Sequence, residues 1–218
     1  MDRILFTDRI DAGRRLAELY DGPRRNVVVM GIARGGIGVG CPIATNLGTT
    51  LDVVTARKLP IPWSPEMGFG AIAPDGSTVL NEELLPRLGL SREEIKAITK
   101  DVLAEVQRRE RVYRGGLPPA SIGDKNVILV DDGLATGYTM IASIEMVKNQ
   151  GASEITVAVP VSPEDTARTI EQMVDRLVVI HIARTSSFAV ASFYSDFHDM
   201  NDSEVLDYLQ KARRAETA

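Results

Sequence analysis

The sequence has little of what disulfides, metal sites and membrane spans require. Cys41 is the only cysteine, and the two histidines, His181 and His198, lie far from it and from each other, so neither an internal disulfide nor a zinc-site spacing is present. No apolar run is long enough to cross a membrane, and residues 1–16 are too charged for a secretion signal. A lone cysteine in such a chain suits a reducing compartment, so we expect a cytoplasmic protein in which Cys41 is a small buried hydrophobe.

Positive charge is not in excess either. Lys and Arg number 25 against 30 Asp and Glu, and the net charge of −5 gives no global field that would favour nucleic acid. Arginines do cluster at Arg108, Arg109, Arg111 and Arg114, and such a run is typical of a solvated helix face. We therefore expect small-molecule partners, without nucleic acid or membrane.

Helices and short apolar strands alternate along the chain. The runs rich in β-branched residues are too short for core helices and are typical of strands buried on both faces. This alternation predicts an α/β fold, a parallel twisted sheet flanked by helices on both faces, in a single domain of residues 1–218. The expected strands are 26–32, 51–56, 127–130, 155–159 and 177–182, and the expected helices include 11–20, 38–47, one ending at 151, 164–174 and 202–214.

Residues 57–80 interrupt the alternation. Their many prolines and glycines predict a long loop or a loose hairpin, and a loop of this length in a compact domain is usually functional or mobile. Ser91-Arg-Glu-Glu94 then forms a capping box, which opens a long helix that ends at Gly115. The apolar stripe of this helix consists of Ile95, Ile98, Val102 and Val106.

The segment that carries the most chemistry follows the strand at 127–130. That strand ends in two adjacent carboxylates, Asp131 and Asp132, at the point where open α/β sheets bind their ligands. Carboxylates accept hydrogen bonds, so this pair suits ribose hydroxyls or the water shell of a magnesium ion. The alternative is that the pair merely caps a helix, although one cap needs only one carboxylate.

A loop of small residues follows the two carboxylates, and then a helix begins. Gly133, Ala135 and Gly137 let the backbone approach a ligand closely, and Thr136 and Thr139 add hydroxyl groups. The unpaired N–H groups at the start of the helix favour an anion, so the loop predicts a phosphate cradle. It does not match the Walker A loop, which needs Gly-Lys followed by Ser or Thr.

This order of strand, two acids, small loop and helix resembles the motif with which type I phosphoribosyltransferases bind 5-phosphoribosyl-1-pyrophosphate (PRPP). In that family the acids hold the ribose hydroxyls, and the loop holds the 5-phosphate. The resemblance assigns ribose binding, together with water-mediated magnesium binding, to Asp131 and Asp132. It assigns the 5-phosphate to the loop residues Gly133, Ala135, Thr136, Gly137, Tyr138 and Thr139.

Gly31-Ile-Ala-Arg-Gly-Gly36, which follows the first strand, resembles the family's pyrophosphate loop. Arg34 is a natural partner for a diphosphate, and the backbone N–H groups of Gly35 and Gly36 would complete the site. The rival interpretation is the dinucleotide fingerprint G-x-G-x-x-G, but the pattern that starts at Gly36 meets Cys41 where it needs a glycine.

Arg57 and Lys58 open the long segment of residues 57–80. In the family a mobile loop at this place closes over PRPP, and basic residues near its start contact pyrophosphate. The alternative is that both residues are solvated loop charges. Glu66, in the same segment, is a further candidate for contact with the metal or the base.

The chain after the last strand, Ser187-Phe-Ala-Val-Ala-Ser-Phe-Tyr-Ser-Asp196, is similar to the family's base-binding hood. Phe188 would stack on a planar base, or else it packs with Phe193 and Tyr194 under the last helix. The resemblance thus implies a core of residues 26–182, a hood from residues 1–22 and 183–218, and a mobile loop at 57–80.

As a whole, the sequence is similar to a group of bacterial and archaeal proteins with a phosphoribosyltransferase domain. The resemblance implies a magnesium- and PRPP-dependent pentosyltransferase of nucleotide salvage, commonly a homodimer, which transfers the 5-phosphoribosyl group to a nucleobase or similar nitrogen nucleophile and releases pyrophosphate. Three departures leave alternatives open. Ala135 stands where 6-oxopurine enzymes place an aspartate base, the uracil-recognition motif is not visible, and Tyr138 is bulkier than usual. The alternatives are a PRPP-binding regulatory protein without transferase activity and a hydrolase of phosphoribosyl compounds.

Overall fold

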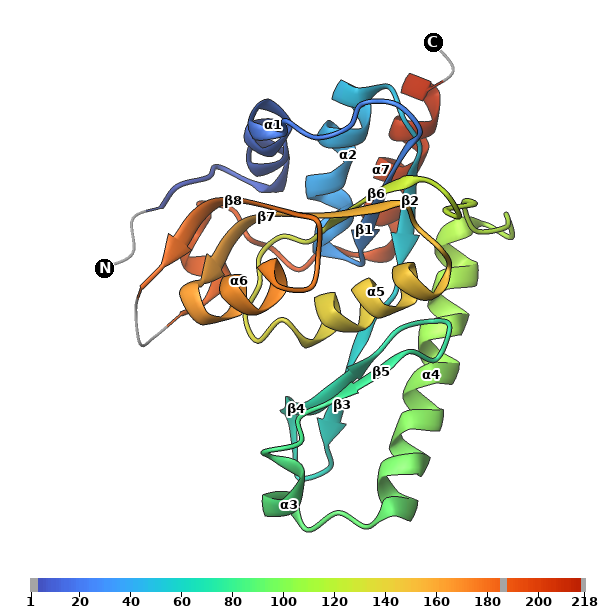
Figure 1. Cartoon of the computed structure of the whole chain (residues 1–218), viewed down its shortest axis with the longest axis vertical. Coiled ribbons are helices and arrows are strands. Elements are labelled where there is room, and N and C mark those ends of the chain that lie inside the picture. Colours follow the sequence, from blue (N-terminus) through green and yellow to red (C-terminus); the bar gives the residue numbers. More distant parts are fainter. Residues whose placement is uncertain (1–3, 185–187, 217–218) are drawn as a thin grey trace.

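A computed structural model describes residues 4–184 and 188–216, which fold around a five-stranded sheet (Figure 1). The strand order is β2-β1-β6-β7-β8, and all neighbouring strands are parallel. The strands are β1 (Val27–Ile32), β2 (Leu51–Val54), β6 (Asn126–Val130), β7 (Glu154–Pro163) and β8 (Arg176–Ala183). Each predicted strand is present, and β7 continues beyond its predicted end because Val161 and Ser162 still pair with β8.

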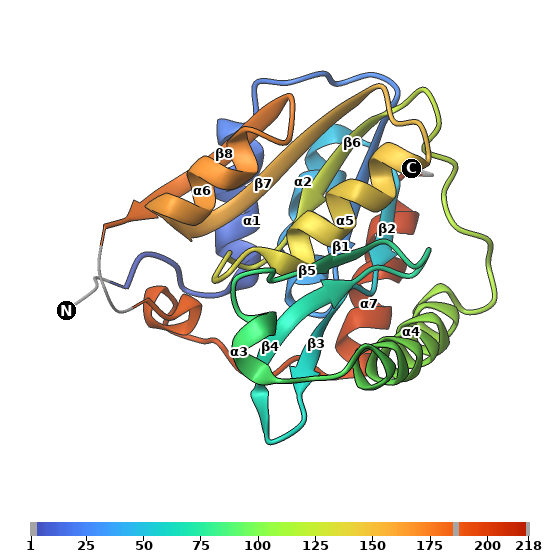
Figure 2. The same cartoon turned by 60° about the horizontal axis from the view of Figure 1, so that its bottom comes forward.

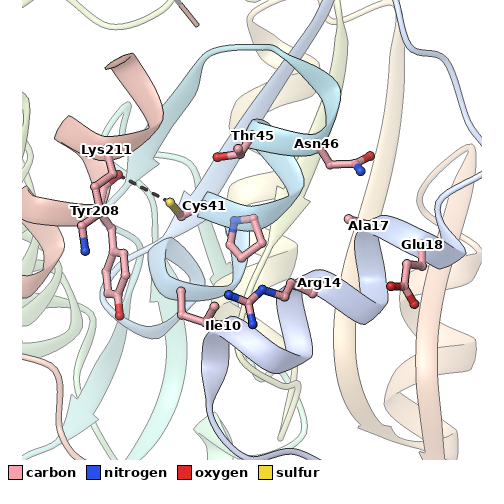
Figure 3. Close-up of a pocket in the computed structure, with 10 residues that line it drawn as sticks. Ile10, Arg14, Ala17, Glu18, Cys41, Thr45, Asn46, Tyr208 and Lys211 are labelled. Carbon is pink, nitrogen blue, oxygen red and sulfur yellow. Dashed lines mark hydrogen bonds between the residues drawn. The ribbon is translucent and has the colours of Figure 1, made fainter. Parts of the chain in front are cut away.

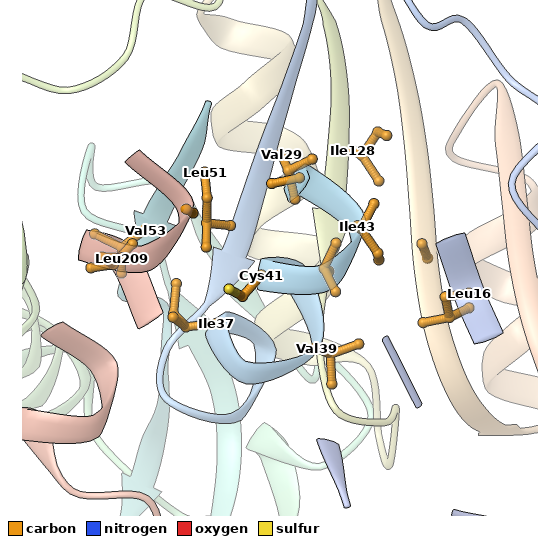
Figure 4. Close-up of a cluster of buried hydrophobic side chains, with 14 of the residues drawn as sticks. Leu16, Val29, Ile37, Val39, Cys41, Ile43, Leu51, Val53, Ile128 and Leu209 are labelled. Carbon is orange, nitrogen blue, oxygen red and sulfur yellow. The ribbon is translucent and has the colours of Figure 1, made fainter. Parts of the chain in front are cut away.

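The sheet is buried on both faces because its apolar side chains alternate between two clusters. Val27 and Val29 of β1 belong to one cluster, and Val28 and Met30 belong to the other. The first cluster is covered by α1 (Arg9–Leu19), α2 (Gly35–Leu47) and α7 (Asp202–Glu216). Figure 4 shows Cys41 within this cluster, which confirms the prediction of a buried hydrophobe. The second cluster is covered by α5 (Tyr138–Asn149) and α6 (Glu164–Glu171), so the predicted fold class is confirmed.

Of the two predicted alternatives for residues 57–80, a long loop or a loose hairpin, the structure shows the hairpin. A third strand extends it. The antiparallel strands are β3 (Arg57–Ile61), β4 (Ser64–Ile72) and β5 (Thr78–Leu80), followed by α3 (Leu85–Leu88) and α4 (Arg92–Arg114). Together they project from the main sheet as an arm (Figure 1, Figure 2). The predicted capping box begins α4, and the predicted apolar stripe of α4 packs against the buried side chains of β3 and β4.

The arginine run on α4 is not uniformly solvated, which corrects our prediction. Arg114 is buried, and its Nε and Nη2 donate to the two carboxylate oxygens of Asp52 on β2, both at 3.1 Å. Glu110 adds an ion pair with Arg114 at 3.0 Å. Since a buried charge is tolerated only when it is paired, this network fixes the end of α4 to the main sheet.

The order of strand addition reverses at β1, because β2 lies on one side of it and β6 on the other. Such a switch point leaves a crevice at the carboxyl ends of the two central strands. The turn after β1 and the loop of residues 131–137 after β6 both emerge there. α2 begins at Gly35 rather than at the predicted Gly38, so its first turn lies directly at this crevice. None of the described helices is both long and apolar enough to cross a membrane.

Candidate functional site

Two loops that are far apart in the sequence touch at the switch point. A Cβ atom on Gly35 would lie 1.8 Å from Oδ2 of Asp132, and a Cβ on Gly36 would lie 2.3 Å from the carbonyl oxygen of Val130. No side chain fits at these distances, so only glycine allows the turn after β1 to pack on the loop after β6. The two segments that we predicted to bind phosphates are therefore side by side.

The loop after β6 is held from its outer side, which leaves its inner side at the crevice. The N–H of Leu134 donates to the carbonyl oxygen of Val161 on β7 at 2.9 Å, and the hydroxyl of Thr166 on α6 donates to the carbonyl oxygen of Ala135 at 2.9 Å. Gly137, with φ of 78°, precedes the first turn of α5, and no side chain caps this helix. The first N–H groups of α5 are therefore not capped by a side chain, and the positive end of the helix dipole faces the loop.

The two carboxylates after β6 influence each other and have one close basic partner. Asp131 accepts a hydrogen bond from the N–H of Asp132 at 2.9 Å, and Asp132 accepts one from Nε of Arg9 at 2.8 Å. Burial and the charge of Asp132 raise the pKa of Asp131 well above its usual value. Burial also raises the pKa of Asp132, although Arg9 counteracts this. A pair of this kind binds hydroxyls or a hydrated cation readily, because such ligands relieve the repulsion.

The carboxylates line a cavity of about 340 Å³ together with residues from several elements. Arg34 stands exposed at its rim, and the preceding Ala33–Arg34 peptide bond is cis. Thr139, from the first turn of α5, also lines it. The remaining lining residues are Arg9, Ile32, Ala33, Gly35, Ala56, Phe197, Asp199 and Met200.

A smaller cavity of about 70 Å³ adjoins this site and is strongly basic. Arg34, Arg57 and Arg109 line it, together with Ala33, Thr55 and Tyr113. Burial and the charges of Arg109 and Arg34 lower the pKa of Arg57. Glu105 is the acid next to this group, and hydrogen bonds from Arg108 and Arg109 lower its pKa to about 2. One carboxylate beside these arginines leaves an excess of positive charge, which suits a polyanion.

Lys58 and Glu66 lie outside both cavities. The ammonium of Lys58 donates to the backbone carbonyl oxygen of Glu66 across the β3–β4 hairpin, and both residues are exposed. Arg57 is therefore the residue of the pair Arg57–Lys58 that the structure brings to the site.

Phe188 is packed rather than free. Its ring lies 5.4 Å from that of Phe193, which belongs to the short helix η1 (Val190–Phe193), and both join a cluster with Phe6 and Tyr194. The packing of Phe188 with Phe193 agrees with our second interpretation, but the cluster includes no residue of α7, so the predicted place under the last helix is wrong. Ser187 lies outside the described residues. The aromatic ring that lines the cavity is that of Phe197.

Arg9, Arg109 and Phe197 are among the lining residues that the sequence did not reveal. Arg109 belongs to the arginine run that we interpreted as a solvated helix face. Arg9 and Phe197 lie near opposite ends of the chain, and no motif marks either of them. Only the folded chain brings them to the carboxylates.

A larger cavity of about 690 Å³ lies elsewhere, between α1, α2 and α7 (Figure 3). Its walls include Cys41, Pro42 and Ala17, with Arg14 and Lys211 at its edges. The carboxylate pair and the glycine-rich turns do not reach it. We therefore assign the functional site to the cavity of about 340 Å³ at the switch point, where those groups converge.

Comparison with known proteins connects this site to a family. The model of the phosphoribosyl transferase domain matches residues 7–198. A Mycobacterium tuberculosis protein, whose name assigns it provisionally to the phosphoribosyl transferases, is 36% identical over 211 residues, which cover 96% of this chain and 47% of that protein. The chain thus spans about half the length of the curated relatives of this kind.

A solved structure extends the likeness to the fold. The crystal structure of TT1426 from Thermus thermophilus superimposes with a TM-score of 0.78 and 32% identity, covering 94% of this chain and 97% of that one. A uracil phosphoribosyltransferase of Arthrobacter is 28% identical over 148 residues, which cover 65% of this chain and 60% of that protein.

Proposed function

Because the chain belongs to the phosphoribosyl transferase family, we propose that it binds PRPP and transfers its 5-phosphoribosyl group to a nitrogen nucleophile. The observation that carries the proposal is the contact between the two ligand loops, in which Gly35 leaves no space between itself and Asp132. A molecule with a phosphate, a ribose and a diphosphate needs all these groups within one crevice. The arrangement meets that need with a phosphate cradle, two carboxylates and a basic rim.

In this proposal each end of PRPP has its own partners. Asp131 and Asp132 accept hydrogen bonds from the ribose hydroxyls. The 5-phosphate binds to the N–H groups and hydroxyls of Gly133, Ala135, Thr136, Gly137, Tyr138 and Thr139. The absence of a side-chain cap on α5 supports this, because an anion can then take the place of the cap.

The pyrophosphate lies at the basic rim. Arg34 and the N–H groups of Gly35 and Gly36 contact it, and Arg57 and Arg109 add charge from the smaller cavity. As the bond from C1 to the pyrophosphate oxygen breaks, its electron pair leaves with the pyrophosphate, while the lone pair of the nucleophile forms the new bond to C1. The transition state resembles an oxocarbenium ion, so cations near the leaving group stabilise it.

The donor set fits a magnesium ion that arrives with the substrate. No group of at least three His, Cys, Asp or Glu side chains suited to a metal exists within residues 4–184 and 188–216. Asp131 and Asp132 would therefore hold the ion through water, and the oxygens of PRPP would supply the remaining ligands. When bound, magnesium neutralises charge on the pyrophosphate.

The acceptor is proposed only as a class, a nucleobase or a similar nitrogen compound. The Phe197 ring and Asp199 line the cavity, and a planar base with N–H donors would be complementary to them. We propose that the base binds under a hood of residues 1–22 and 183–218, which contains Phe188 and Phe197, and that the arm with Glu66 closes over PRPP. A role in nucleotide salvage, a cytoplasmic location and a homodimer are also proposed, on the basis of the family alone.

One observation favours a second candidate, a PRPP-binding regulator without transferase activity. Ala135 offers no base in the phosphate loop, and its carbonyl oxygen is already used by Thr166. A site that binds PRPP needs no base, whereas a site that activates a 6-oxopurine does.

Incubation with PRPP and magnesium, with and without a panel of purines and pyrimidines, separates the candidates. A nucleotide formed together with pyrophosphate supports the transferase, and Asp131→Asn/Asp132→Asn should abolish it. PRPP that binds but persists with every base supports the regulator. Ribose 5-phosphate released without a base identifies a hydrolase. PRPP that neither binds nor reacts contradicts the proposal.

A further inference from the structure

We propose that Arg9 is a positioning residue of the ribose site, which acts by orienting Asp132 and by fixing the cavity wall at Phe197 and His198. This inference rests on the proposed function, because it concerns how the site holds the ribose of PRPP. Neither the sequence motifs nor the comparisons point to Arg9. Its place in the structure is what suggests the role.

The guanidinium of Arg9 has three partners from two distant parts of the chain. Its Nε donates to Oδ2 of Asp132 at 2.8 Å, and its Nη1 donates to the carbonyl oxygen of His198 at 2.9 Å. Its central carbon lies 4.0 Å from the centroid of the Phe197 ring. An arginine that is only 9% exposed and makes two hydrogen bonds and one stacking contact is fixed in orientation.

The surroundings are shaped for this side chain. A Cβ on Gly35 would lie 3.0 Å from Nε of Arg9. Asp8 caps the start of α1 by accepting from the N–H of Asp11 at 2.8 Å, which fixes the helix turn that carries Arg9. The lack of a side chain at Gly35 and the helix cap thus favour the observed position of the guanidinium.

The contact has a direct consequence for Asp132. With Oδ2 engaged by Arg9, the rotation of the carboxylate is fixed, and Oδ1 remains for a ribose hydroxyl. The hydroxyl of Tyr194 donates to the backbone carbonyl oxygen of Asp132 at 2.7 Å and fixes the main chain as well. Prior orientation of a hydrogen-bond acceptor raises affinity, because binding then loses less conformational freedom.

Lysine cannot replace Arg9 fully. Its ammonium could approach Asp132, but it lacks the planar group that stacks on Phe197 while also donating to His198. The chain supplies a matched control in Arg15, which lies on the same helix, pairs with Asp11 at 3.0 Å and is exposed.

The test is calorimetric titration of Arg9→Gln, Arg9→Lys and Arg15→Gln with PRPP and magnesium, with ribose 5-phosphate, and with pyrophosphate in the absence of magnesium. We expect Arg9→Gln to weaken the binding of PRPP and of ribose 5-phosphate by at least about tenfold, the usual loss for one charged hydrogen-bond partner. Metal-free pyrophosphate, which does not involve Asp132, should bind to this variant as to the wild type. Arg9→Lys should be intermediate, and Arg15→Gln should match the wild type.

The outcomes separate this inference from the proposed function. Wild type that does not bind PRPP overturns both. Wild type that binds PRPP while Arg9→Gln binds within about twofold of it overturns only the role of Arg9. Equal weakening of pyrophosphate and ribose 5-phosphate also overturns it, because the role would then be merely structural. If Arg9→Gln does not fold, Arg9→Lys decides: weaker binding of ribose 5-phosphate with unchanged binding of metal-free pyrophosphate supports the role of Arg9, and wild-type affinity for both ligands overturns it.

Discussion

Substitution of Gly35 by alanine tests the contact between the two ligand loops. The new Cβ would lie 1.8 Å from Oδ2 and 2.4 Å from Cγ of Asp132, so the carboxylate has to move. It cannot move freely, because Arg9 holds it at 2.8 Å in a pair whose side chains are only 10% and 16% exposed. Separating such a pair costs about 3 kcal/mol. Gly35 is the first residue of α2, so alanine gains little of the helix-interior propensity there. The net expectation is a loss of about 2 to 3 kcal/mol in the free energy of unfolding.

Gly38→Ala in the same helix is the matched control. Its Cβ would lie 3.3 to 3.4 Å from Arg9 and Met200, distances that small adjustments can accommodate. Urea denaturation should show Gly35→Ala destabilised and Gly38→Ala close to the wild type, and calorimetry should show that only Gly35→Ala loses PRPP. A Gly35→Ala variant with the stability and PRPP affinity of the wild type would refute the loop contact as described.

Three further predictions follow from single contacts. Asp131→Asn should raise the free energy of unfolding by about 1 kcal/mol at pH 7, because the raised pKa of Asp131 means that the folded chain loses stability as pH rises through that pKa. Urea unfolding at pH 5 and pH 7 checks this, because the gain in stability of Asp131→Asn over the wild type should be smaller at pH 5. No gain in stability at either pH would contradict the prediction. Arg114→Met should cost about 3 kcal/mol, because it leaves Asp52 buried without its cation, and a shift below about 1 kcal/mol in urea would count against this. Arg109→Gln should weaken the binding of magnesium pyrophosphate about tenfold, as measured by calorimetry. Arg108→Gln, which removes an exposed partner of the same Glu105, should leave this binding unchanged. Equal effects of the two substitutions would exclude a specific role for Arg109.

The sheet and the position of the two loops at the switch point could be predicted from the sequence because their signals are local. A β-branched run such as Val127–Val130 has few alternatives to a buried strand, and the acids, small residues and helix that follow it keep a fixed order. The capping box at Ser91 is equally local, and α4 begins there as predicted. Physical constraints of this kind act within a few residues.

Other features depend on contacts that no local pattern contains. The prolines and glycines of residues 57–80 allow either a loop or a hairpin, and packing against α4 selects the hairpin. Arg9 sits among other charged residues of α1, and its role appears only when Asp132 and His198 are brought to it. Phe188 and Phe197 follow the same strand, and only the fold decides which ring packs with Phe193 and which lines the cavity. Arg109 and Arg114 differ in the same way, since one lines a cavity and the other is buried against Asp52.

Titration of PRPP into the protein by calorimetry, with and without magnesium, shows whether the crevice at the switch point binds this ligand. We predict saturable, magnesium-dependent binding at one site per chain, which Asp131→Asn/Asp132→Asn loses while remaining folded. Wild-type protein that binds no PRPP in either condition would contradict the proposed function, and the two loops would then serve another ligand.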